Sequence, residues 1–176
     1  MTNDWLPEDD WAWIQRRVPI ACVDVLALRF DLASLQPQSV GLILRDVPDA
    51  GRRWCLMGGR IRYGEAILDA LARHVHDTLG ERVRFATTSG DQPIYVAQYA
   101  PDARPGFGLD PRRHAIALTF AITLEGEVKP QGEAFEFRWF AADSPPTASA
   151  FGFGQDAVVS ACLKAVGNPA RGEIRA

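Results

Sequence analysis

The feature that most constrains this chain is a glycine-rich segment between an apolar run and an amphipathic helix, within residues 54–79. Gly58 and Gly59 follow the apolar run, and glycine allows backbone conformations and close approaches that a side chain would block. The apolar residues that come next recur at helical spacing, at Leu68, Leu71, Val75 and Leu79. The pattern predicts a strand, a glycine-rich loop, a helix that begins at Glu65 and a stop at Gly80.

A polar face lies beside the apolar stripe of this predicted helix. At about 100° per residue, Ala70, His74, Asp77 and Thr78 point in similar directions. A short polar face next to a glycine loop indicates a binding or catalytic site as well as packing.

The same segment resembles the Nudix box. Gly59, Glu65, Arg73, Val75 and Gly80 occupy the frame of that box in register. Members of the family hydrolyse nucleoside diphosphates linked to another group, usually with magnesium. The resemblance therefore implies a nucleotide diphosphate as the ligand and an α/β/α sandwich with a central mixed β-sheet.

Strands and helices predicted from the rest of the chain agree with that architecture. The predicted strands are residues 19–30, 40–45, 52–56, 82–87, 92–100, 114–124 and 135–141, and a last helix covers Gln155–Val166. A mixed sheet between helical layers is the fold that this order favours.

The box is degenerate at its acidic positions, because the family has glutamates where this chain has His74, Asp77 and Thr78. Magnesium prefers hard oxygen ligands, so Glu65 and Asp77 are the main candidates to hold a metal. His74 and Asp77 together could bind a softer divalent ion such as manganese or zinc, or they form an ordinary surface pair. The expected cofactor is a divalent metal, magnesium or manganese.

Outside the box the chain is similar to the GDP-mannose mannosyl hydrolase branch, and its GLDPRRHAIALTF and GEAFEFRWF segments resemble an uncharacterised Nudix-related family. By position, Asp24, Arg45, Arg60 and Arg73 match polar site residues of that branch, and His114 matches a histidine there. The branch cleaves at the sugar carbon and binds its substrate with arginines and one magnesium ion. The resemblance implies a nucleotide sugar as the substrate.

Three arginines make physical sense as phosphate ligands, because a forked guanidinium matches a pyrophosphate bidentately. Arg45 and Arg60 are expected to bind the ligand, with the backbone of residues 58–59 close to the same phosphates. Arg73 has an alternative role, which is to pair with an acid of its own segment and brace the loop against the helix. Asp24 lies in an apolar strand and needs a partner or a wet edge; if its role is structural, the expected partner is an arginine.

Glu133 and Glu136 lie just ahead of Trp139 of the last predicted strand, and either is a candidate base for activating water. Solvent exposure is the alternative for both. Two functions remain open on these residues. One is a Nudix-type hydrolase, and the other is a Nudix-fold protein that binds or senses a nucleotide derivative without turnover.

The composition suits one domain over residues 1–176, with 47% apolar and 23% charged residues. The net charge of -3 gives no general attraction to nucleic acid or to a membrane. Three widely spaced cysteines favour reduced thiols in a cytoplasmic protein over disulfides or a zinc site. A helix predicted at residues 6–17 is expected to pack on the domain or on a second subunit of a homodimer, and residues 168–176 are predicted to fray.

Overall fold

The computed structural model describes residues 6–167, so the predicted tail at 168–176 lies outside the described residues. The elements in chain order are α1 (Glu8–Gln15), β1 (Ile20–Phe30), β2 (Pro37–Val47), β3 (Gly51–Cys55), β4 (Met57–Arg60), α2 (Ile67–Leu79), β5 (Arg84–Thr87), β6 (Tyr95–Ala100), β7 (Gly108–Leu109), β8 (Ala115–Glu125), β9 (Glu136–Ala141), a 3-10 turn η1 (Ala148–Ala150) and α3 (Gln155–Val166).

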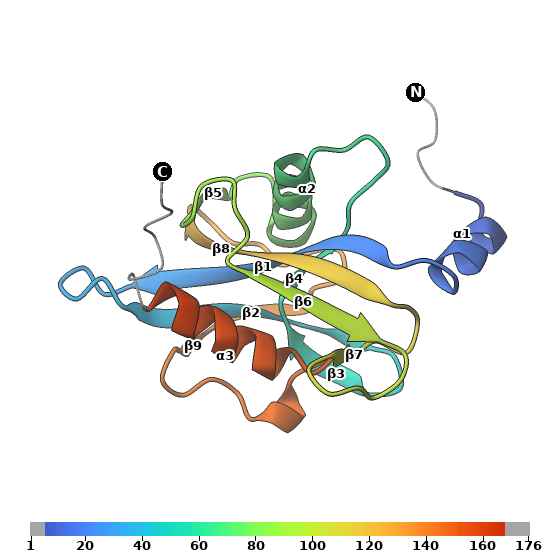
Figure 1. Cartoon of the computed structure of the whole chain (residues 1–176). Helices are drawn as coiled ribbons and strands as arrows, with labels where there is room; N and C mark the ends of the chain where they lie inside the picture. Colours follow the sequence, from blue (N-terminus) through green and yellow to red (C-terminus); the bar gives the residue numbers. More distant parts are fainter. Residues whose placement is uncertain (1–5, 168–176) are drawn as a thin grey trace, which may run out of the picture.

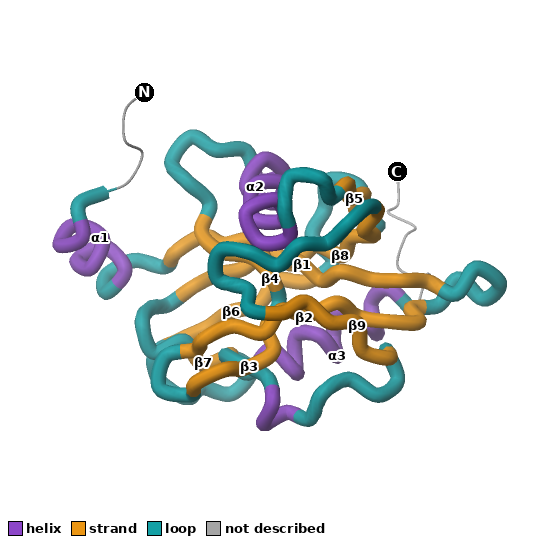
Figure 2. Tube along the Cα trace, turned by 180° about the vertical axis from the view of Figure 1, so that it is seen from behind, coloured by secondary structure: helices purple, strands orange, loops and turns teal. Residues whose placement is uncertain are grey.

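The strands form one curled mixed sheet in which β1 is central. β1 runs parallel to β8 along most of its length, and it pairs antiparallel with β4 through its first half and with β2 through its second half. Because β1 changes partner midway, the sheet forks there. α2 and α3 cover opposite faces of the sheet (Figures 1 and 2). The predicted sandwich of helices around a mixed sheet is confirmed.

The core has two parts, one on each face of the sheet, because side chains of a strand alternate between faces. Val23, Val25 and Ala27 of β1 pack with the apolar stripe of α2, whereas Cys22, Leu26 and Leu28 pack with α3. Asp24 falls on the α3 side by the same alternation. A carboxylate is thus carried into the interior by the register of a buried strand.

The composition of the glycine segment predicted a loop, and this prediction was wrong. The segment forms the short strand β4, which pairs with β1. A side chain at Gly58, where φ is +141°, would collide with the carbonyl oxygen of Val23. A Cβ at Gly59 would lie 2.6 Å from the His74 ring. The two glycines are required because β4 is pressed between the central strand and α2.

The helix after β4 begins at Ile67, two residues later than predicted. The carboxylate of Glu65 accepts a 2.8 Å hydrogen bond from the backbone N–H of Arg62, which closes a turn ahead of the helix. Ala66, in an extended conformation, is the N-cap. Glu65 therefore stabilises the turn that precedes the helix. The sequence had predicted it in the first turn of the helix itself.

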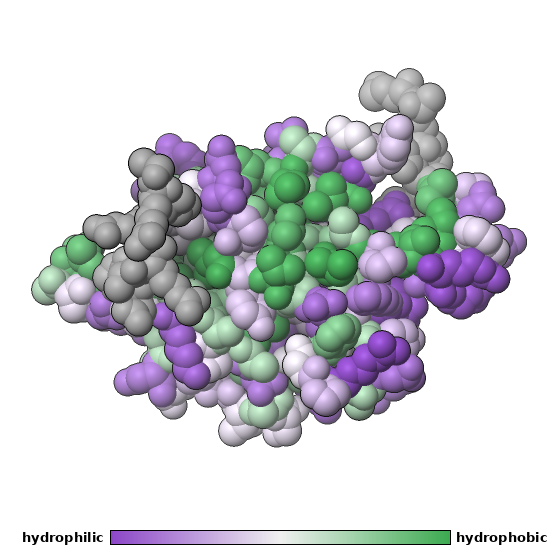
Figure 3. All heavy atoms as spheres, viewed as in Figure 1, coloured by the Kyte–Doolittle hydropathy of each residue, from purple (hydrophilic) through white to green (hydrophobic). Residues whose placement is uncertain are grey.

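The surface facing the viewer in Figure 1 has an apolar region in its middle, over the strands between α2 and α3 (Figure 3). Tyr95 and Val96 of β6 have 36% and 51% of their surface exposed. None of the helices within residues 6–167 is long and apolar enough to cross a membrane.

Candidate functional site

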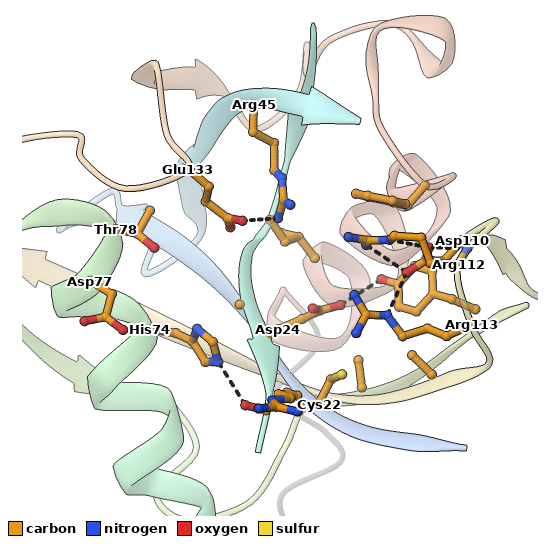
Figure 4. Close-up of a pocket in the computed structure, with 18 of the residues that line it drawn as sticks. Cys22, Asp24, Arg45, His74, Asp77, Thr78, Asp110, Arg112, Arg113 and Glu133 are labelled. Carbon is orange, nitrogen blue, oxygen red and sulfur yellow. Dashed lines mark hydrogen bonds and ion pairs between the residues drawn. The ribbon is translucent and has the colours of Figure 1, made fainter. Parts of the chain in front are cut away.

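A cleft of about 500 Å³ opens at the fork of the sheet. It is rich in charge, since six arginines and four carboxylates line it: Arg45, Arg60, Arg62, Arg73, Arg112, Arg113, Asp24, Asp77, Asp110 and Glu133. Figure 4 shows α2 on one side of the cleft, Arg112 and Arg113 on the other, and Asp24 between them.

Most of the candidate residues meet in this cleft. The predicted phosphate ligands Arg45, Gly58, Gly59, Arg60 and Arg73 line it, and so do Asp24, His74, Asp77 and Glu133. These residues come from β1, β2, β4, α2 and the segment before β9, so folding unites positions more than a hundred residues apart.

Three candidates do not line the cleft. The Oε1 atom of Glu136 is bound by Arg138, with the Nη2 atom at 2.6 Å. His114 lies next to Phe107, with ring centroids 6.1 Å apart. The carboxylate of Glu65 is covered by Arg73, which reaches it with two hydrogen bonds. The geometry therefore favours Glu133 over Glu136 as the acid that meets a ligand.

Asp24 forms the buried floor of the cleft, and its partner is a tyrosine and not the arginine expected for a structural role. The hydroxyl of Tyr99 donates to Oδ2 of Asp24 at 2.7 Å, and the side-chain amide of Gln155 contacts the same hydroxyl at 3.3 Å. Oε1 of Gln155 in turn accepts from the backbone N–H of Leu56. Burial raises the pKa of Asp24 to about 6, against the opposing effects of the Tyr99 hydrogen bond and of Arg45. The floor therefore carries a proton-exchanging group near neutral pH.

Glu133 and Arg45 form an ion pair at 2.7 Å on the wall next to α2 (Figure 4). Burial raises the pKa of Glu133, while Arg45 and Arg112 act in the opposite direction. The Nε atom of Arg45 is buried and has no hydrogen-bond partner within the described part of the chain. The pair thus places a guanidinium with spare donor capacity next to a carboxylate of raised basicity.

The polar face of α2 is held to β4 by a second set of contacts. Arg73 binds both oxygens of Glu65, at 2.6 and 2.8 Å, and donates to the carbonyl of Arg60 at 3.1 Å. It also lies 3.8 Å from Asp77. The bracing role that the sequence left open for Arg73 is thus the one its side chain adopts in this structure.

His74 is also engaged, because its Nε2 atom lies 3.2 Å from the carbonyl oxygen of Arg60. Burial lowers the pKa of His74, which favours the neutral ring. Packed under β4, the imidazole positions the glycine strand against the helix.

The candidate metal ligands on α2 and in the turn before it do not match a magnesium ion held by protein carboxylates. Glu65 is neutralised by Arg73, His74 is bonded to a carbonyl, and Asp77 is the remaining acid of the predicted metal set. No group of three or more His, Cys, Asp or Glu residues within residues 6–167 is arranged to hold a metal ion. Magnesium takes mostly carboxylate oxygens and water, so these residues supply too few ligands of the right kind.

The wall opposite α2 was not found from the sequence. Asp110, Arg112 and Arg113 come from the turn before β8, and they line the cleft together with Trp11 of α1 and Phe153. The available signal was the run DPRR ahead of a long apolar strand, since charged residues at the end of a strand often face a site. The helix of Trp11 packs on the domain, which is one of the two placements expected for it.

A family model described as "Domain of unknown function (DUF4916)" matches residues 1–168. Among curated proteins, the low-salt glycan biosynthesis protein Agl8 of Haloferax volcanii is 28% identical over 122 residues, which are 69% of this chain and 70% of that protein.

Two solved structures are similar along nearly their whole length. The crystal structure of a possible asymmetric diadenosine tetraphosphate (Ap4A) hydrolase from Jonesia denitrificans has a TM-score of 0.77 and 30% identity, and covers 86% of this chain and 96% of that one. The MutT NUDIX hydrolase from Burkholderia pseudomallei has a TM-score of 0.62 and 19% identity, with 85% and 99% covered. The second likeness bears on the fold alone.

Proposed function

Because this chain belongs to the DUF4916 family and has the Nudix hydrolase fold that its glycine segment predicted, we propose that it hydrolyses a nucleoside diphosphate linked to another group. One observation carries this proposal. Arg45 and Arg60 converge on the same cleft as the glycine strand and as Glu133, an acid of raised pKa that is paired with Arg45.

Phosphate binding in this proposal is the work of arginines. A guanidinium can engage two phosphate oxygens at once, and the small residues Gly58 and Gly59 let the backbone of β4 approach the ligand. Arg73 contributes indirectly, because it fixes the turn at Glu65 and the end of β4. Such an array neutralises a diphosphate without the glutamates that the Nudix box normally has.

Glu133 is the proposed base. When Arg45 turns toward a phosphate, its influence on Glu133 weakens, and the basicity of the carboxylate increases. Glu133 then accepts a proton from water, the water oxygen bonds to the attacked atom of the substrate, and the bond to the leaving oxygen breaks. The leaving oxygen takes up a proton from solvent.

A nucleotide sugar is the proposed substrate class. The sequence similarity to the mannosyl hydrolase branch supports it, and so does the glycan biosynthesis protein that is 28% identical to this chain. The name of the structure from Jonesia denitrificans points instead to a dinucleoside polyphosphate. Both classes offer a phosphate chain to the arginines, so both belong in the test.

The test is a panel of nucleoside-diphosphate sugars, ADP-ribose and Ap4A, assayed with magnesium, with manganese and with EDTA. Released phosphate and reducing sugar report turnover, and the shift in melting temperature reports binding. Glu133→Gln should lower kcat by about 100-fold or more, the usual contribution of general base catalysis, and should keep the thermal shift. Glu136→Gln is the matched control, because that residue lies outside the cleft, and should retain activity.

A binding protein without turnover is the second candidate, and the composition of α2 favours it. Asp77 is the acid that this helix presents to the cleft, where Nudix enzymes present several glutamates. This candidate predicts stabilisation by a nucleotide derivative with no product under any metal condition. Absence of both product and stabilisation across the whole panel would reject both functions.

A further inference from the structure

The turn before β8 holds two arginines on one buried acid. Asp110, with 6% of its surface exposed, accepts hydrogen bonds from Nε of Arg112 at 2.8 Å and from Nη2 at 2.9 Å. Nε of Arg113 lies 3.5 Å from the same carboxylate. Burial would raise the pKa of Asp110, but the hydrogen bonds from Arg112 and the charges of Arg112 and Arg113 together keep the pKa below its usual range. One carboxylate therefore orients two guanidiniums and compensates only one of their charges.

Two aromatic rings fix the direction of these guanidiniums. The Cζ atom of Arg112 lies 5.2 Å from the centre of the Phe153 ring, and Arg45 approaches the same ring at 5.8 Å. The Cζ atoms of Arg60 and Arg113 lie 4.3 and 5.6 Å from the centre of the Trp11 ring. Cation–π contacts of this kind favour a fixed guanidinium. Because arginines contact both rings, this end of the cleft is built for an anion and not for stacking a base.

Positive charge is in excess at this end of the cleft. Burial lowers the pKa of Arg60, and the neighbouring Arg62, Arg113 and Arg73 add to that shift by repulsion. Figure 4 shows Arg112 and Arg113 across the cleft from α2, with Asp24 between the two walls. An anion placed there would relieve the repulsion.

We propose that Arg112 and Arg113 form a second anionic subsite, which binds a further phosphate group of a ligand whose first phosphates lie at Arg45 and Arg60. The inference deepens the proposed function, on which its placement of the diphosphate rests. It assigns the protein a preference for ligands with more than two phosphate groups in a chain, or with a separate phosphate beyond the diphosphate.

The subsite can be tested with inorganic ligands, independently of any nucleotide or turnover. Isothermal titration calorimetry should give tighter binding of tripolyphosphate than of pyrophosphate to the wild type. Arg113→Gln should weaken tripolyphosphate binding by about 10-fold or more, the range for a lost charged hydrogen bond, with much less effect on pyrophosphate. This variant keeps the bidentate pair of Asp110 with Arg112, so the buried acid retains a partner.

Arg84→Gln is the matched control, since Arg84 has the same charge, is 83% exposed and lies on β5 outside the cleft. It should change neither affinity. Equal affinity of the wild type for the two ligands, or an equal loss for both in Arg113→Gln, would overturn the subsite. If Arg113→Gln does not fold, the comparison of the two ligands on the wild type still decides. If no nucleotide of the panel is turned over but the wild type still prefers tripolyphosphate, the hydrolase function is rejected and the subsite is not.

Discussion

The hydroxyl of Tyr99 donates a 2.7 Å hydrogen bond to Oδ2 of Asp24, and this pair is buried beneath the charged cleft. The contact opposes the effect of burial on Asp24, because it stabilises the ionised carboxylate. The pKa of Tyr99 is also shifted, since burial and then the charge of Asp24 raise it well above the usual value. The protonation of the floor is thus coupled to a hydrogen bond between two residues that lie 75 positions apart.

Tyr99→Phe should raise the pKa of Asp24 further above about 6, because the group loses the donor that favours its charged form. At pH 8 the free energy of unfolding should fall by about 1–3 kcal/mol, the cost of leaving a buried acceptor without a partner. Carboxyl NMR titration and urea denaturation measure the two effects. Tyr95→Phe on the same strand, where the ring is partly exposed, should leave both unchanged. An unaltered titration of Asp24 in Tyr99→Phe would show that the Tyr99 hydrogen bond does not influence the pKa of Asp24.

The pH dependence of stability should carry the signature of Asp24. Its pKa is raised in the folded state from 3.8 to about 6, so the folded protein binds this proton more tightly than the unfolded chain. The stabilisation is complete below pH 4 and is lost as the pH rises through 6. The free energy of unfolding of Asp24→Asn, measured relative to the wild type, should therefore rise by about 2–3 kcal/mol from pH 4 to pH 7. One pKa unit corresponds to about 1.4 kcal/mol.

Urea unfolding of both proteins across that range gives the difference curve, in which the other titrating groups cancel. Asp143→Asn, a substitution at an exposed aspartate, should give a flat difference. A flat curve for Asp24→Asn as well would show that the floor carboxylate does not titrate in this window.

Glu65→Gln should destabilise the protein by about 2 kcal/mol at pH 7, because the partly buried Arg73 loses a charged partner that accepts two hydrogen bonds. The hydrogen bonds from Arg73, against burial, lower the pKa of Glu65 to about 2. Its contribution is therefore present above about pH 4.5 and is lost as the pH falls toward 2. Denaturation at pH 7 and at pH 3 measures this, and the difference between variant and wild type should shrink at pH 3.

Glu125→Gln serves as the comparison for Glu65, because its partner Arg84 is exposed and the pair lies on the surface. Surface pairs contribute about 0–1 kcal/mol. A loss of similar size in the two variants would mean that the turn before α2 is not braced by its ion pair.

Thr78→Glu should increase the affinity for Mn²⁺ or Mg²⁺, because it adds a second carboxylate next to Asp77 on the face of α2 that lines the cleft. Mn²⁺ binding followed by electron paramagnetic resonance measures it directly. Thr78→Gln, of the same size and neutral, should bind no more metal than the wild type. If the glutamate variant also shows no gain, the polar face of α2 is not the metal side of the cleft.

The sequence by itself determined the fold and the α2 wall of the site. The glycine pair, the helical spacing of Leu71, Val75 and Leu79 and the frame of the box are local patterns, and local patterns are fixed by backbone geometry over a few residues. They identified the Nudix fold and placed Arg45 and Arg60 beside the glycines. The strong β-branched and apolar content of residues 20–30 likewise identified the central strand.

Only the tertiary structure decided what completes the cleft. Tyr99 meets Asp24 because β6 pairs with β8 and β8 pairs with β1, and Arg113 meets Trp11 because the turn before β8 lies near α1. No local periodicity records such pairings. The choice between Glu133 and Glu136 also needed the tertiary structure. The two acids are only three positions apart, yet Glu133 faces the cleft and Glu136 pairs with Arg138. Side-chain direction at a strand edge follows from register with neighbours, and register is a property of the assembled sheet.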